Sequence, residues 1–147
     1  MERFGFEGFD VFDYGAELWS LADDIARRIR PERRHLADQL ERASHSIVLN
    51  IAEAAGRYSP GAKANAYRIA RGSANETAAI FVLLERKGLI SEAEATHARR
   101  LLLSIIAMLS RLAINFERKA LLARPGNVGH NPRKTPRPDA VAPKSSP

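Results

Sequence analysis

The chain has 147 residues, of which 45% are hydrophobic, and this size suits one domain rather than two. It contains no cysteine, which excludes disulfide bonds, thiolate metal ligands and a cysteine nucleophile, and is typical of proteins of the reducing cytoplasm. The net charge of +6 favours an anionic partner such as nucleic acid.

The first ten residues lack the pattern of a secretory signal. Acidic side chains outnumber the single cation, Arg3, whereas a signal begins with a basic segment. The most apolar stretch, residues 101–116, contains Arg111 and is shorter than the ~20 residues that cross a bilayer. We therefore expect a cytoplasmic protein without a membrane anchor.

Apolar side chains recur at steps of three and four residues along most of the chain, which predicts helices and no strands. The first predicted helix runs from about Phe9 to Arg30 and is ended by Pro31. The second runs from about Arg33 to Gly56, because glycine suits the left-handed residue after a helix.

The next two predicted helices begin at recognisable caps. Ser59 followed by Pro60 is typical of an N-cap with proline in the first turn, and this helix ends before Gly88. Ser91 and Glu94 form a capping box, and the helix that follows reaches about residue 122.

Four helices joined by short connections predict an all-α fold, an antiparallel up-down-up-down four-helix bundle, over residues 1–123. Residues 124–147 hold most of the prolines and several basic side chains but few large apolar ones, which predicts a disordered tail. Such a tail is either a solubilising extension or a basic arm that contacts phosphates.

The third and fourth predicted helices carry more apolar side chains than one face of a bundle needs. Residues 80–84 and residues 101–116 are apolar on more than one side of the helix. A single copy of the chain has no second surface to cover them, so this excess predicts self-association into a homo-oligomer.

Polar side chains follow one side of the second and third predicted helices, again at steps of three and four. We expect them to meet between the two helices and share hydrogen bonds that fix the helix register, since a slipped pairing leaves donors and acceptors without partners. A ligand-binding or catalytic role is the alternative. The predicted network consists of Gln39, Arg42, Ser46, Asn50, Glu53, Ser73 and Glu76.

Four cations lie in a stretch without acidic residues between Glu53 and Glu76, and a ring of subunits would repeat them around its axis. The candidate nucleic-acid-binding residues are Arg57, Lys63, Arg68 and Arg71.

The second predicted helix also gathers potential metal ligands on one side, but it lacks the paired Glu-x-x-His motifs of a metal-binding bundle. These residues are His35, Asp38, Glu41 and His45. We expect no metal, no cofactor and no catalytic residue, because no acid, base and nucleophile converge.

Residues 39–59 and 69–76 resemble the family named for 23S rRNA intervening sequences, whose motif reads approximately QxxRAxxSIxxNIAEGxGRxS followed by IARGSxxE. The resemblance covers about Phe9 to Leu112 and departs from the motif at Ala54, where the family usually has glycine. It implies a small antiparallel bundle that assembles into a ring, usually a homopentamer, without established enzymatic activity.

A more distant similarity, to the accessory protein of diversity-generating retroelements, implies nucleic acid and a reverse transcriptase as partners. We therefore expect a non-enzymatic scaffold with RNA or DNA as a partner. The alternative is a protein-binding adaptor whose basic residues only keep it soluble, and an enzyme is a third class.

Overall fold

The computed structural model describes residues 1–125, and these contain three α-helices and no strand. Helix α1 spans Asp10–Gly56, α2 spans Pro60–Arg86 and α3 spans Glu92–Leu122. The predicted all-α class is confirmed. The tail that the sequence predicts to be disordered is residues 124–147. From residue 126 onward it lies outside the described part of the chain.

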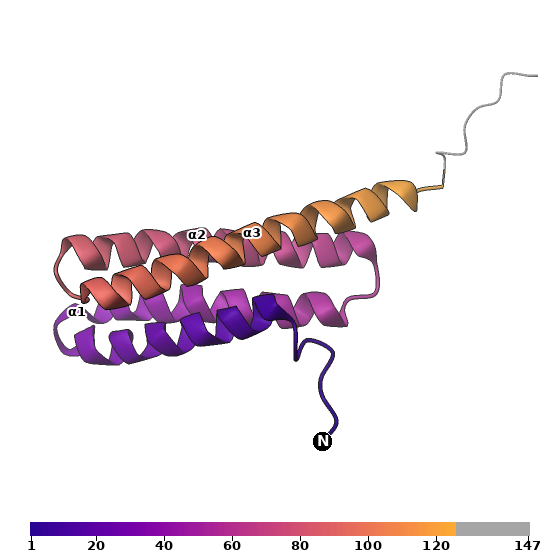
Figure 1. The fold of residues 1–147 in the computed structure, drawn as a ribbon. Helices are drawn as coiled ribbons and strands as arrows, with labels where there is room; N and C mark the ends of the chain where they lie inside the picture. Colours follow the sequence, from indigo (N-terminus) through magenta and orange to yellow (C-terminus); the bar gives the residue numbers. More distant parts are fainter. Residues whose placement is uncertain (126–147) are drawn as a thin grey trace, which may run out of the picture.

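Helix α1 reverses direction within its length. Its backbone leaves helical geometry at Arg33, where φ is −136° and ψ is 47°. Figure 1 shows that the residues before and after this point run side by side in opposite directions, and we call them the first arm (residues 10–32) and the second arm (residues 34–56). The arms touch closely, since a Cβ added at Gly15 would lie 3.6 Å from Val48 and from Ile51.

The expectation of four separate helices is not confirmed, because the first two form one bent element. The predicted end at Arg30 was wrong: Pro31 remains inside α1, and the break comes at Arg33. Proline removes one hydrogen bond and crowds the preceding turn, which loosens a helix there without ending it at that residue. The guanidinium of Arg30 lies 2.5 Å from a carboxylate oxygen of both Asp38 and Glu41, so ion pairs hold the reversal.

The core lies between the two arms, α2 and α3, and consists of aliphatic side chains interleaved with alanine. Leu18 and Ile25 of the first arm, Ile47 of the second, Leu84 of α2 and Ile105 of α3 are all fully buried. Removal of such side chains from water is the main force that holds the helices together. Figure 1 shows that α3 runs alongside α2 and extends beyond the start of α1. The last part of α3 therefore has no arm of α1 beside it.

The helix starts predicted from caps are confirmed. The Ser59 hydroxyl accepts a hydrogen bond from the backbone of Ala62, and Pro60 is the first residue of α2. Ser91 and Glu94 form the full capping box of α3. Gly88 follows the end of α2 and has φ of 66°. Glycine adopts this left-handed conformation without strain, and the chain turns away from the helix there.

The prediction that Gly56 is a left-handed residue after the helix was wrong. Gly56 is the last helical residue of α1 and has no positive φ. The carbonyl groups at this helix end are instead satisfied by a side chain. The ammonium group of Lys63 donates to the carbonyl oxygens of Ala54 and Ala55, at 2.9 and 3.2 Å. A cation at the C-terminal end of a helix also complements the helix dipole.

Glu94 joins the start of α3 to the first arm of α1. Its carboxylate accepts hydrogen bonds from the guanidinium of Arg28, at 2.8 and 3.0 Å, and from the backbone of Ser91. The bond from Arg28 is the main cause that holds the pKa of Glu94 below its ordinary value. A carboxylate whose pKa is lowered on folding stabilises the fold above its unfolded pKa and loses this contribution as the pH falls through the folded value.

We therefore expect Glu94→Gln to lower the free energy of unfolding by roughly 0.5–1 kcal/mol at pH 7. The difference from the unsubstituted chain should shrink as the pH falls below the ordinary glutamate pKa of about 4.3 and then through the lowered pKa of the folded state. Urea unfolding at pH 7 and at pH 3 measures both values. Glu92→Gln is the matched control, since Glu92 is exposed in the same first turn and forms no ion pair within residues 1–125. An equal loss in the control would contradict the assignment.

Candidate functional site

The polar side chains predicted to form a network meet in part between the second arm of α1 and α2. The hydroxyl oxygens of Ser46 and Ser73 lie 2.8 Å apart, across the two helices. The amide of Asn50 donates to the carbonyl oxygen of Ser46 at 2.8 Å and to its hydroxyl at 3.1 Å. These groups are half-buried, so a shift of one helix along the other would break bonds that water cannot fully replace.

The remaining network residues are placed elsewhere. The carboxylate of Glu53 pairs with Arg57 on the same helix, and Gln39 contacts His35 at 3.1 Å. Arg42 and Glu76 are exposed and share no hydrogen bond or ion pair with any residue of the described chain. The structure therefore brings together Ser46, Asn50 and Ser73 and not the other four.

Three of the four candidate nucleic-acid-binding cations already have partners within the chain. Arg57 pairs with Glu53, Lys63 binds helix carbonyls, and Arg68 lies 3.0 Å from Glu117 of α3. Arg71 is half-buried, and no acidic side chain in residues 1–125 pairs with it.

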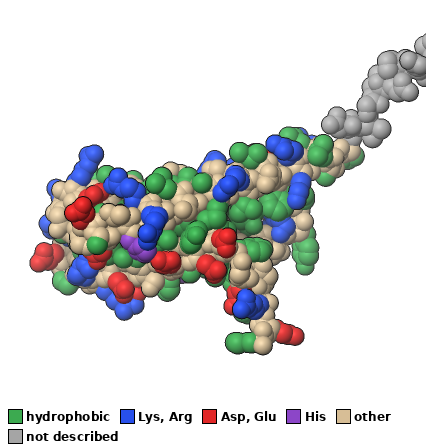
Figure 2. Space-filling model, in the orientation of Figure 1, with side chains coloured by type: hydrophobic (Ala, Val, Ile, Leu, Met, Phe, Trp, Pro, Cys, Tyr) green, Lys and Arg blue, Asp and Glu red, His purple; other side chains and the backbone are tan. Residues whose placement is uncertain are grey.

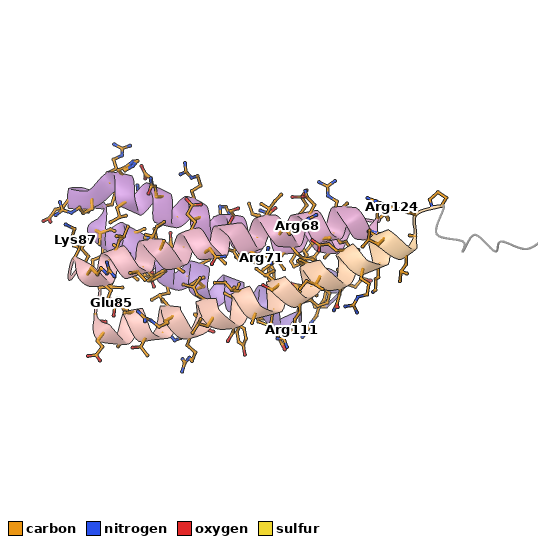
Figure 3. The ribbon with its side chains drawn as sticks, turned by 90° about the horizontal axis from the view of Figure 1, so that it is seen from above. Arg68, Arg71, Glu85, Lys87, Arg111 and Arg124 are labelled. Carbon is orange, nitrogen blue, oxygen red and sulfur yellow. The ribbon has the colours of Figure 1, made fainter. Side chains whose placement is uncertain are left out.

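More cations lie nearby, on the second half of α3. Figure 3 shows Arg68 and Arg71 along α2, and Arg111 and Arg124 along the neighbouring half of α3 and beyond its end. Lys119 is also on this half, with its ammonium group 4.8 Å from the centre of the Phe116 ring. Cations thus lie on both helices, whereas the four candidates predicted from the sequence all lie within residues 57–71.

Helix α3 exposes a stripe of apolar side chains that begins within the excess of apolar residues predicted at 101–116 and continues beyond it. Leu103 is 66% exposed, Ile114 51% and Leu121 58%, and Ala107 is also exposed. Residues spaced by four and by seven lie on one side of a helix, as at the contact positions of a coiled coil. We call these four residues the α3 stripe. The seven-residue steps from 107 to 114 to 121 are the signal that could have found it.

The potential metal ligands of the second arm are occupied by other contacts. Asp38 and Glu41 both pair with Arg30, and the His45 ring packs 6.0 Å from the ring of Trp19. Nowhere in residues 1–125 do three or more His, Asp or Glu side chains form a group that could hold a metal ion. The described helices also include none that is both long and apolar enough to span a bilayer.

The Ser46–Ser73 contact gives a stability prediction. Ser46→Ala removes the hydroxyl that Ser73 and Asn50 use, and we expect a loss of about 1 kcal/mol in the free energy of unfolding. The double substitution Ser46→Ala with Ser73→Ala should cost less than the sum of the single ones, because the second change removes a group that has already lost its partner. Urea unfolding of all four chains measures the coupling, and strictly additive losses would argue against a shared bond.

Comparison with known proteins places the chain in a family. The sequence model described as 23S rRNA-intervening sequence protein matches residues 12–111, which include the arms of α1, all of α2 and most of α3. No curated protein sequence matches the chain closely enough to serve as a relative. The match covers more than half of the chain, and it includes the Ser46, Asn50 and Ser73 contact. The chain therefore belongs to the 23S rRNA-intervening sequence protein family.

Proposed function

We propose that this protein is a non-enzymatic, cytoplasmic scaffold that assembles from several copies of the same chain. In each copy the two arms of α1 act as separate helices, so that with α2 and α3 they form a four-helix bundle. The ring, usually a pentamer, implied by the family resemblance is the form of assembly that we favour. A protein of this kind works by presenting repeated surfaces to a partner, and RNA or DNA is the partner that its charge favours.

The α3 stripe is the observation that carries this proposal. Burial of one leucine or isoleucine side chain stabilises an assembly by about 1.5–3 kcal/mol before the costs of association. Leu103, Ile114 and Leu121 are each a source of such contact energy, and Val82 of α2 lies beside Leu103 in the same shallow groove. Several large apolar side chains exposed along one side of a helix are typical of a contact surface, and Arg111 and Arg118 lie between them on α3.

The nucleic-acid part of the proposal is supported by the cations that no carboxylate of the described chain neutralises. Arg71 is one, and Arg111 and Arg118 on α3 are others. One copy offers few such groups, and each phosphate contact is weak at physiological salt. An assembly repeats the set in every subunit, and repetition raises the overall affinity without new kinds of contact.

The first test is the mass of the protein in solution. We expect multi-angle light scattering at micromolar concentration to give several times the 16.3 kDa of one chain. Leu103→Glu with Ile114→Glu should shift this mass to that of a single chain, because the variant places charges in an apolar contact.

Leu49→Glu is the matched control, since Leu49 is a similarly exposed leucine, at 55%, on the second arm of α1. It should leave the mass unchanged. If Leu49→Glu dissociates the assembly and Leu103→Glu with Ile114→Glu does not, the contact between copies lies on α1. A single-chain mass for the unsubstituted protein would contradict the scaffold altogether.

The second test is a titration of labelled single-stranded RNA and DNA at two salt concentrations. We expect affinity to fall steeply as salt rises, with a slope of about 0.7 per phosphate contact on a logarithmic plot. Arg71→Ala with Arg111→Ala should weaken binding and reduce this slope. Arg99→Ala is the control, because Arg99 lies on the first half of α3 and pairs with Glu85 of α2.

Lack of binding at low salt would contradict the nucleic-acid part alone. The scaffold would then be a protein-binding adaptor, the alternative function, for which a reverse transcriptase is one candidate partner. The apolar α3 stripe fits both versions, so the salt titration is the measurement that separates them.

A further inference from the structure

A cleft lies between the start of α1 and the second half of α3, and Tyr67 of α2 also lines it. Its volume is about 580 Å³, which is within the range of pockets that hold small molecules. Figure 2 shows hydrophobic side chains gathered in this hollow. The chemistry of the wall therefore indicates the kind of molecule that the cleft suits.

The apolar part of the wall includes three aromatic rings and a thioether. The rings are those of Phe9, Tyr67 and Phe116, and the last two are stacked 5.8 Å apart. Met108 supplies the thioether, whose sulfur makes favourable contacts with aromatic rings. Such a wall suits an aromatic occupant, because contacts between rings, and between sulfur and a ring, add to the gain from burying apolar surface.

The Tyr67 hydroxyl is a polar group that the packing of the helices leaves unbonded. The residue is 3% exposed, and its hydroxyl forms no hydrogen bond with any of residues 1–125, although buried tyrosine hydroxyls usually have a partner. No side-chain oxygen of the described chain is both fully buried and unbonded, so this hydroxyl reaches the open space of the cleft. Burial raises the pKa of Tyr67, so the hydroxyl keeps its proton at neutral pH and can donate to an acceptor there.

The two charged side chains that line the cleft have opposite signs. Asp10 comes from the first turn of α1 and Arg111 from α3, and both are exposed. Asn115, which also lines the cleft, is polar but uncharged. A cleft attracts ions of one sign when charges of the other sign dominate its lining. Here neither sign dominates, which favours an uncharged occupant.

We propose that the α1–α3 cleft binds a small uncharged aromatic compound that accepts a hydrogen bond from the Tyr67 hydroxyl. The ring of the compound lies against Phe9, Met108 and Phe116, and its one polar atom faces Tyr67. Burial of the ring supplies most of the binding energy, and the hydrogen bond selects compounds with an acceptor over plain hydrocarbons. A single copy of the chain contains the whole cleft, so this inference goes beyond the proposed scaffold and does not depend on its assembly.

The chain has two methionines, which allow a direct test, because Met108 lines the cleft and Met1 is fully exposed. In the full chain with isotope-labelled methionine methyl groups, we expect 2-naphthol to shift the Met108 NMR signal saturably and to leave the Met1 signal unchanged. Tyr67→Phe should weaken 2-naphthol binding by roughly three- to tenfold, because it removes one hydrogen bond and keeps the ring. It should not weaken the binding of naphthalene, which has no polar atom. Tyr58→Phe, at a fully exposed tyrosine, is the matched control and should affect neither compound.

Three results would overturn the proposal, with circular dichroism confirming that each variant keeps its fold. The first is the lack of a saturable Met108 shift with 2-naphthol. The second is a Tyr67→Phe chain that binds 2-naphthol as tightly as before, or that loses affinity for naphthalene by the same factor. The third is tighter binding of the anion 2-naphthoate than of 2-naphthol. That result would indicate an anion site, since the ammonium groups of Lys63 and Lys119 lie 5.8 and 4.8 Å from the centre of the Phe116 ring without lining the cleft.

Discussion

The reversal of α1 at Arg33 is the constraint on which the other packing depends. It turns one long helical segment into two antiparallel arms, so that Gly15 lies against Val48 and Ile51 and the two arms bury a common apolar surface. The pairing of Arg30 with Asp38 and Glu41 across the bend supports it, and the hydrogen bond that Arg30 donates to Glu41 is the main cause that raises the pKa of Arg30. If the bend opened, α1 would be one rod, and α2 and α3 would lose the core contacts that one of the arms supplies.

Within this frame α3 has three different surroundings. One side is buried, with Leu102, Ile105 and Leu109 in the core, and a second side, with Met108 and Leu112, lines a cleft between α3 and the start of α1. The third side is the exposed α3 stripe. A helix that serves one bundle needs only the first of these, which explains why residues 101–116 are apolar around more than one face. The element least explained by the fold of a single copy is thus the one that we assign to contacts between copies.

The features that could be predicted from the sequence are those set by neighbouring residues. Ser59 with Pro60 and Ser91 with Glu94 mark helix starts because the cap bonds span only three residues. The features that could not be predicted depend on how helices are rotated and spaced. Lys63 binds the carbonyl groups of the α1 end rather than remaining open to a phosphate, since an unsatisfied helix end lies within its reach.

The polar network shows the same limit. Steps of three and four place Ser46, Asn50 and Ser73 on facing sides, but they place Arg42 and Glu76 near those sides as well. Rotation of either helix by a fraction of a turn decides which side chains meet, and that rotation follows from the core and not from the polar residues. The cleft is another such case, because it depends on how far the second half of α3 stands from the first arm of α1.

The distribution of charge links the fold to the proposed partner. Arg28, Arg30, Arg57, Arg68 and Arg99 each pair with a carboxylate, so much of the positive charge of the described helices is already neutralised at short range. Surface pairs of this kind add little to stability, but they reduce the field that an approaching phosphate meets. In the function that we propose, binding of nucleic acid therefore requires the remaining cations of several subunits to act on one strand. Such a requirement makes assembly the first step of recognition and makes the affinity depend steeply on salt.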